Sequence, residues 1–269
     1  MEFGGSVVKH TFIREKSLTR RDCVFKSVRL FVYSQEEQAA ARRTRQKRER
    51  ATLPKVKSMN DRYSRELFEW LVQNNFTRND YFITLTFSGK VSEQDGKRLF
   101  GNYIRRLRRL YHSKSAALKY IYVEEFGETS GLYHVHLLID SAGDIISEKE
   151  ITHLWKKKGI CDIEYLHFTA EGLSVLCRYL MKSQKSNPKY KRLWNCSQSC
   201  TRPEVVTDDN RISRITMRKL QNAARNDELV SAIERIYTGW RVLSAPEIGV
   251  NDVTGREYMR VRLMRKSSG

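Results

Sequence analysis

The stretch YVEEFGETSGLYHVHLLI, residues 122–139, has the pattern of a β-hairpin, and the expected fold is built around it. Aromatic and β-branched residues, which favour strands, occur in both arms, 122–127 and 133–139. The residues between the arms are typical of turns: Gly127, Thr129, Ser130 and Gly131. The stretch therefore predicts two antiparallel strands joined by a short turn.

The two histidines of this hairpin share one face of the sheet, because residues two apart in a strand point the same way. A turn centred at 129–130 places Glu125 opposite His134. The same register places Val123 opposite His136. Cross-strand partners have Cβ atoms about 5 Å apart, so one carboxylate and two imidazoles converge. That set suits a divalent metal, Mn²⁺ or Mg²⁺.

Two alternatives stay open at this hairpin. A His-x-His pattern also occurs on the polar outer face of a strand, but Ile121, Val123 and Leu138 share this face and predict that it is partly buried. A bulge would shift the register by one residue and put Glu124 in place of Glu125.

The composition limits the partners of the chain. Its 269 residues suffice for one domain with extensions or for two small domains. A net charge of +19 attracts polyanions, nucleic acid before an anionic membrane. The sequence has no apolar run of transmembrane length and no signal-peptide core. The cysteines are scattered and lack the paired spacing of a zinc site, which predicts a reduced, cytosolic protein: Cys23, Cys161, Cys177, Cys196 and Cys200.

Residues 1–75 predict a basic, partly helical N-terminal extension. A short strand is expected around 25–32, and residues 36–50 predict a helix that becomes strongly basic and that Pro54 ends. This basic run suits non-specific phosphate contact, with a solvated helix face as the alternative. An amphipathic helix is expected at 60–74.

Residues 76–205 predict the central domain. The expected elements are a strand at 81–87, a helix at 92–112, the hairpin, a helix from 147 to 159, a strand at 161–168 and a helix at 173–186. This order predicts an α+β fold with a ferredoxin-like or RRM-like antiparallel sheet and helices packed on it. Such a sheet is a common platform for nucleic acids.

Basic side chains gather at two places in this domain, where we expect contacts with DNA. One group lies near the end of the 92–112 helix, where it also suits the helix dipole: Arg105, Arg106, Arg108, Arg109 and Lys114. The other surrounds two aromatic residues, Tyr190 and Trp194: Lys185, Lys189, Lys191 and Arg192. Aromatic residues among cations suit stacked bases of single strands, although Trp194 fits a core position equally well.

Residues 206–269 predict a C-terminal helix followed by short strands. A long amphipathic helix is expected within 208–239, with five packing positions: Ile215, Leu220, Leu229, Ile233 and Ile236. A hairpin is expected within 242–263. The sequence has no Walker A pattern, so no fused helicase is expected.

Three motifs stand in order along the chain: YFITLTF at 81–87, EEFG to HVH at 124–136, and YLMK at 179–182. Together they resemble the HUH endonuclease superfamily, specifically its rolling-circle replication initiators, the Rep proteins of phages, plasmids and other mobile elements. The resemblance extends over about residues 60–205 and includes the predicted fold.

The resemblance implies an enzyme, a metal-dependent DNA nickase and strand transferase that acts on single-stranded DNA at a replication origin. In it, His134 and His136 match the paired metal ligands, and Glu125 matches the third ligand. Tyr179 matches the nucleophile, and Lys182 matches the lysine that follows it. Attack by Tyr179 would leave a 5′-phosphotyrosine link and a free 3′-hydroxyl.

The same resemblance implies partners and a location. The 3′-hydroxyl would prime a host DNA polymerase, with a host helicase as a further partner, in the cytoplasm of a bacterial cell. Many relatives carry a second tyrosine four residues after the first, where this chain has Ser183. A single-tyrosine enzyme would need the Tyr179 of a second copy, or a fresh encounter, to close the strand.

Other functions stay open at this point. A single-tyrosine HUH transposase shares the motif order, but such enzymes are typically shorter and lack so long a basic N-terminal segment. A non-catalytic nucleic-acid-binding module, or an inactive relative acting as a repressor, explains the charge and the fold. On helix position alone Tyr179 also fits a core residue, and Tyr165 and Tyr190 are the next candidates for the nucleophile.

Overall fold

A computed structural model describes residues 11–34, 36, 54–127, 131–156, 158–182, 192–251 and 255–266. These residues form an α+β protein with two antiparallel sheets. The chain divides into two compact units. We call Ser64–Arg202 the central unit, and Met1–Tyr63 together with Pro203–Gly269 the terminal unit.

The described part of the central unit is built on a five-stranded sheet with the order β6-β3-β5-β4-β7. Its strands are β3 (Tyr81–Phe87), β4 (Tyr120–Phe126), β5 (Tyr133–Ile139), β6 (Gly159–Tyr165) and β7 (Asn195–Cys196). β4 and β5 form the expected hairpin, and Glu125 lies opposite His134 as predicted. The antiparallel α+β fold expected from the sequence is therefore confirmed.

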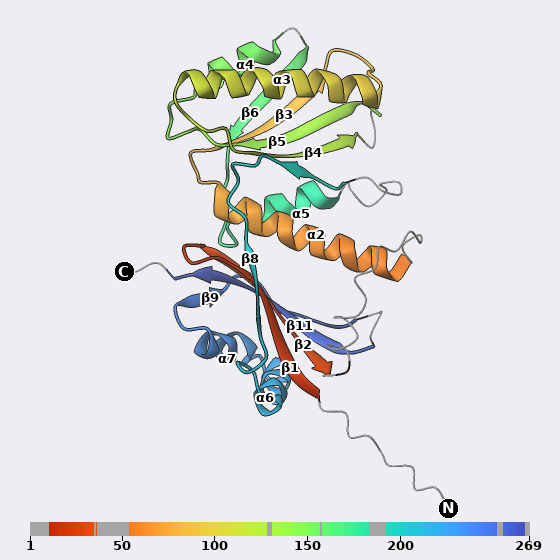
Figure 1. Cartoon of the computed structure of the whole chain (residues 1–269), viewed down its shortest axis with the longest axis vertical. Helices are drawn as coiled ribbons and strands as arrows, with labels where there is room; N and C mark the ends of the chain where they lie inside the picture. Colours follow the sequence, from red (N-terminus) through yellow and green to blue (C-terminus); the bar gives the residue numbers. More distant parts are fainter. Residues whose placement is uncertain are drawn as a thin grey trace, which may run out of the picture. The chain divides into compact units, whose positions relative to one another are not determined.

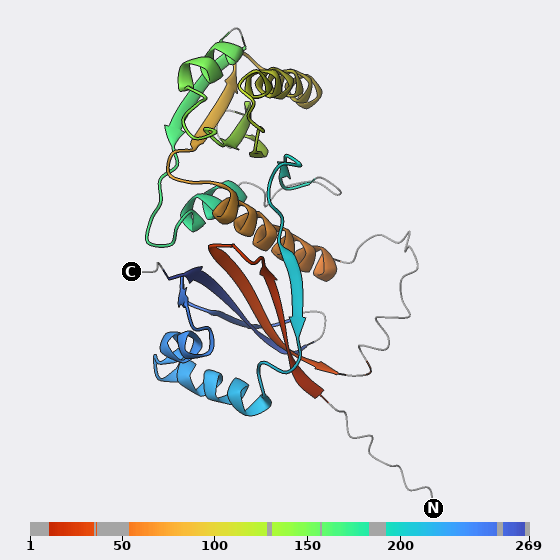
Figure 2. The ribbon, with the colours of Figure 1, turned by 60° about the vertical axis from the view of Figure 1, so that its left-hand side comes forward.

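Helices cover both faces of this central sheet (Figures 1 and 2). One face carries α3 (Glu93–Ser113) and α4 (Glu148–Trp155), and the other carries α5 (Ser174–Lys182) and the last part of α2 (Pro54–Asn75). Ser92 caps α3 by accepting a hydrogen bond from the Asp95 amide, and Ser147 opens α4 with the predicted capping box. The two faces of the sheet therefore have different coverings.

The face under α3 and α4 holds the main core of the unit. Alternate strand residues such as Leu85 and Leu137 are fully buried there, as are Leu107 of α3 and Trp155 of α4. Because strand residues alternate between faces, the neighbours of these core residues project to the side of α5. That alternation delivers the motif residues to one surface.

The terminal unit is built on a second sheet, in which the described strands follow the order β10-β11-β2-β1-β8, with β9 paired to β11. Its strands are β1 (Thr11–Thr19), β2 (Phe25–Ser34), β8 (Glu204–Asp208), β9 (Trp240–Val242), β10 (Glu247–Val250) and β11 (Glu257–Arg265). Two helices, α6 (Arg214–Arg225) and α7 (Leu229–Ile236), pack on one face of it (Figure 1). Segments from both ends of the sequence thus share one core.

A buried carboxylate anchors this second core. Glu15 on β1 is 3% exposed and accepts a hydrogen bond from the Tyr237 hydroxyl at 2.8 Å. Lys26 and Arg211 lie 3.8 and 3.5 Å from its carboxylate oxygens. Burial raises the pKa of Tyr237 and lowers the pKa of Lys26.

The terminal segments differ from their sequence interpretation. The division at 75 and 205 does not coincide with the observed units, because residues 11–34 pair with 204–208 and 257–265 in one sheet. Strand pairing between distant segments leaves no local pattern in the sequence. Pro54 begins α2 rather than ending a helix, as suits a residue that lacks an N–H. The basic run within 36–50, apart from residue 36, lies outside the described residues.

The long helix expected within 208–239 is two helices. Asp227 between them has a φ of 57°, in the left-handed region that aspartate and asparagine adopt more readily than most residues. Ile215, expected to pack, is 67% exposed, because α6 buries the stripe of Met217, Leu220 and Ala223 instead. Leu229 and Ile233 pack as predicted.

No helix in the described ranges is both long enough and apolar enough to cross a membrane.

Candidate active site

The strand register places a set of polar side chains on the face of the central sheet that α5 covers, which we call the histidine face. His134 and His136 of β5 pair with Thr86 and Thr84 of β3, respectively. On the other side of β5, His134 pairs with Glu125 of β4. The predicted register therefore holds, and the bulge that would have exchanged Glu124 for Glu125 is absent from the described β4–β5 pairing.

Glu125 and His136 are in direct contact on this face. Glu125 Oε1 lies 2.7 Å from His136 Nε2, and the side chains are 18% and 7% exposed, respectively. A hydrogen bond between an imidazole and a carboxylate at this depth is shielded from water and fixes both groups. Glu124 instead projects to the opposite face, where its carboxylate accepts a hydrogen bond from the Tyr133 hydroxyl.

Threonines hold the other edge of each imidazole ring. Thr84 Oγ1 lies 3.2 Å from His136 Nδ1, and Thr86 Oγ1 lies 3.3 Å from His134 Nδ1. Such contacts at Nδ1 orient the rings and leave Nε2 as the nitrogen available to a ligand. Burial and the neighbouring His136 lower the pKa of His134, against the opposing effect of Glu125. His134 therefore favours the neutral form that binds metals.

Aromatic rings flank His136 on two sides. Phe82 stacks on it with ring centroids 5.7 Å apart and an interplanar angle of 15°. The ring of Tyr179 meets it edge to face, with centroids 6.0 Å apart and an angle of 70°. Tyr179 is 58% exposed, so a large ligand can reach its hydroxyl. It is not the core residue that its helical position alone also allowed.

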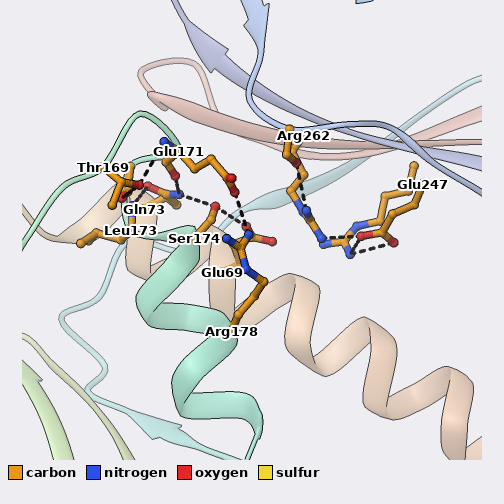
Figure 3. A network of polar contacts seen from close by, with 12 residues as sticks. Glu69, Gln73, Thr169, Glu171, Leu173, Ser174, Arg178, Glu247 and Arg262 are labelled. Carbon is orange, nitrogen blue, oxygen red and sulfur yellow. Dashed lines mark hydrogen bonds and ion pairs between the residues drawn. The ribbon is translucent and has the colours of Figure 1, made fainter. Parts of the chain in front are cut away.

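A buried polar network fixes the start of α5, the helix that carries Tyr179 (Figure 3). The Gln73 side chain donates to the Glu171 carbonyl and to Ser174 Oγ, at 3.1 and 3.0 Å. It also accepts from the Leu173 amide at 3.1 Å. Ser174 Oγ in turn donates to Glu69 Oε1 at 2.6 Å. The end of α2 thus satisfies polar groups at the beginning of α5.

Two further contacts stabilise this helix. Arg178 Nη1 lies 2.7 Å from Glu171 Oε2 at its start, an exposed ion pair that Figure 3 also shows. Arg65 Nη1 donates to the Met181 carbonyl at 2.8 Å, so a cation caps a carbonyl of the last turn. Lys182, the final residue of α5, is exposed and lies one turn after Tyr179.

The donor set fits a divalent cation, although the described residues contain no group of three His, Cys, Asp or Glu side chains already arranged as ligands. Glu125 and His136 are in contact, and His134 shares their face. One carboxylate and two neutral imidazoles suit Mn²⁺, and Mg²⁺ accepts the carboxylate. The predicted convergence is therefore complete for two of the three residues.

The predicted DNA-contact residues lie away from the histidine face. Arg105, Arg106 and Arg109 are exposed on α3, which covers the opposite face of the sheet. Arg105 and Arg192 line one open pocket there. Arg106 donates to the Leu154 carbonyl at 3.3 Å. The other predicted contacts, Lys185, Lys189 and Lys191, fall outside the described residues, as does Tyr190.

Sequence reasoning did not select several residues that shape the site. Thr84 and Thr86 had a signal, because their alternation in YFITLTF places them on the face opposite to the buried Ile83 and Leu85. Gln73 and Glu69 had none, since their partners lie about 100 residues away. Trp194 packs on Phe68 with centroids 5.9 Å apart, and its indole donates to Ser64.

Residues 80–184 match the model of one protein family, described as replication-associated protein ORF2. No curated protein matches the chain. The matched segment begins just before β3 and extends beyond the last residue of α5. It therefore contains both histidines, Glu125, Tyr179 and Lys182. The part of the chain that forms the histidine face is similar to replication-associated proteins.

Proposed function

We propose that this protein initiates rolling-circle DNA replication by nicking and rejoining single-stranded DNA through a covalent link to Tyr179. The contact that carries the proposal is the edge-to-face packing of the exposed Tyr179 ring on His136, which itself contacts Glu125. A nucleophile beside a set of metal-binding side chains suits phosphoryl transfer. The match to replication-associated proteins supports DNA as the substrate.

In the proposed step, the Tyr179 oxygen attacks the phosphorus of one phosphodiester. The bond between phosphorus and the 3′ oxygen breaks, which leaves a 5′-phosphotyrosine and a 3′-oxygen that takes up a proton. The tyrosine proton must leave during attack, because a phenol with a pKa near 10 is a weak nucleophile while protonated. A bound divalent cation would neutralise charge on a non-bridging oxygen and orient the phosphate.

The residues of this chain have separate tasks in that step. Glu125, His134 and His136 hold the cation, and Thr84 and Thr86 orient the two imidazoles. The α2–α5 network keeps Tyr179 in place. Lys182, one helical turn after Tyr179, supplies positive charge beside the phosphate.

Rejoining reverses the same chemistry. The phosphotyrosine retains the energy of the original diester, so a 3′-hydroxyl displaces Tyr179 without ATP. The 3′-hydroxyl that nicking releases also serves as a primer for a host polymerase. With Ser183 four residues after Tyr179, closure of the circle requires the tyrosine of a second copy or a second encounter.

The test is a covalent adduct assay with single-stranded DNA of the replicon that carries this gene. We expect a protein–DNA adduct on a denaturing gel with Mn²⁺, no adduct with EDTA, and none for Tyr179→Phe. The matched control is Tyr165→Phe, which changes another exposed tyrosine of the same unit and should leave the adduct intact. DNA binding without any adduct would reject the nickase and favour a non-catalytic binding module.

A further inference from the structure

An open pocket of about 640 Å³ lies between α3 and β4, on the face of the central sheet opposite to the histidines. We call it the α3–β4 pocket. Six residues define its chemistry: Lys97, Phe100, Arg105, Arg108, Tyr122 and Arg192. Its volume is in the range of pockets that hold a molecule the size of a nucleotide. The proposed nicking chemistry uses none of these residues.

Aromatic rings form the apolar part of the pocket. Phe100 of α3 meets Tyr122 of β4 with ring centroids 4.7 Å apart and an interplanar angle of 63°. Tyr122 also stacks with Tyr120, at 6.1 Å and 29°. Arg108 donates to the Tyr120 hydroxyl at 3.1 Å, which joins a cation to this aromatic cluster. Partly exposed rings beside arginines are a surface on which a nucleobase stacks.

Charge in the pocket is predominantly positive. Four cationic side chains line it, and Glu124 supplies the one carboxylate of its lining among the described residues. Lys97 lies 2.7 Å from Glu93 and 3.9 Å from Glu124, which partly neutralises it. Arg105 and Arg192 are exposed and come from segments almost ninety residues apart in the sequence. Two exposed guanidinium groups beside aromatic rings are suited to a phosphate next to a base.

β4 connects this pocket to the histidine face. Glu124 lines the pocket, and its neighbour Glu125 projects to the histidines, since successive strand residues point to opposite faces. In the described residues the ladder between β4 and β7 pairs only Ile121 and Tyr122. A strand of nucleic acid that leaves the histidine face past the end of this ladder reaches the pocket by crossing one edge of the sheet.

We propose that the α3–β4 pocket binds one nucleotide of the single-stranded DNA substrate, at a distance from the phosphate that is cut. The base stacks on Tyr122 and Phe100, and Arg105 and Arg192 contact its phosphate. The pocket thereby gives the protein a second hold on the strand, independent of the metal. This inference rests on the proposed function for its choice of DNA as the ligand.

The test measures equilibrium binding of a fluorescent single-stranded oligonucleotide to the full chain in EDTA, where no cleavage is expected. Arg105→Gln and Arg109→Gln form a matched pair, because both remove one exposed charge from α3 and only Arg105 belongs to the pocket lining. We expect Arg105→Gln to weaken binding about tenfold, with a salt dependence reduced by about 0.7 in log–log slope. Arg109→Gln should weaken binding less than threefold. Equal effects of the two changes would overturn the proposal.

A second measurement locates the base. An oligonucleotide that contains 5-iododeoxyuridine is cross-linked to the protein by ultraviolet light, and the modified peptide is identified by mass spectrometry. We expect cross-links at Tyr120 or Tyr122, lost in Tyr122→Leu. Cross-links confined to Phe82 and Tyr179 would overturn the proposal and leave the nickase untouched. Failure of the wild-type protein to bind DNA would reject both proposals.

Discussion

Glu125 Oε1 lies 2.7 Å from His136 Nε2, while the adjacent Glu124 accepts a hydrogen bond from Tyr133 on the other face of the same strand. The two glutamates are neighbours in sequence, and the sheet separates them. Their different surroundings make them a natural pair for comparison, because the same chemical change can be made on each face of β4.

Glu125→Gln should abolish metal-dependent adduct formation, because a neutral amide is a much weaker ligand than a carboxylate. Glu124→Gln should retain at least a third of the adduct rate, since Glu124 faces away from the histidines. The measurement is the initial rate of adduct formation in Mn²⁺. Equal losses in both variants would remove Glu125 from the proposed metal site.

Thr84→Val should weaken Mn²⁺ binding about tenfold, because it removes the hydroxyl beside His136 Nδ1 and frees the ring to rotate. Titration calorimetry of the full chain without DNA measures this directly. Thr207→Val is the control, since it makes the same change at an exposed strand position of the terminal unit. An unchanged affinity in Thr84→Val would show that the hydroxyl does not orient the ligand.

Gln73→Leu should lower the free energy of unfolding of the central unit by about 2 kcal/mol, because the Leu173 amide and Ser174 lose a buried partner. The adduct rate should fall about tenfold or more as Tyr179 loses its fixed position. Urea denaturation and the adduct assay give the two values. Gln221→Leu, a glutamine-to-leucine change on α6, should alter neither. A stable Gln73→Leu protein with full activity would contradict the positioning role of the network.

Glu150 provides a pH-dependent contribution to stability. Hydrogen bonds from Lys114 and from Ser147 lower its pKa to about 2. In the unfolded chain a glutamate titrates near pH 4.3, so the stabilisation is complete above about pH 5 and is lost as the pH falls toward 2. Because the carboxylate is exposed, solvent screening limits its size to about 1 kcal/mol or less. Glu150→Gln should therefore be less stable than wild type at pH 6 and approach it at pH 2. An NMR titration that gave Glu150 an ordinary pKa would contradict this.

Local sequence patterns specify the central sheet and much of the site. Strict alternation in YFITLTF and in the hairpin arms specified which side chains share a face, so the pairing of Glu125 with His134 followed from a turn position alone. Serine followed three residues later by an acidic residue located the starts of α3 and α4. These features depend on neighbours a few residues apart, which is the range over which a sequence pattern carries structural information.

The contacts between distant segments come from the folded chain instead. Strands from both ends of the chain form the second sheet, and their pairing depends on shared burial rather than on any local signal. Gln73 holds the start of α5 from about 100 residues away, and Arg105 and Arg192 line one pocket. The contact of Glu125 with His136, rather than with its direct cross-strand partner His134, is also a property of side-chain packing. Such contacts arise only when the folded backbone brings the segments together, since the sequence order does not encode their proximity.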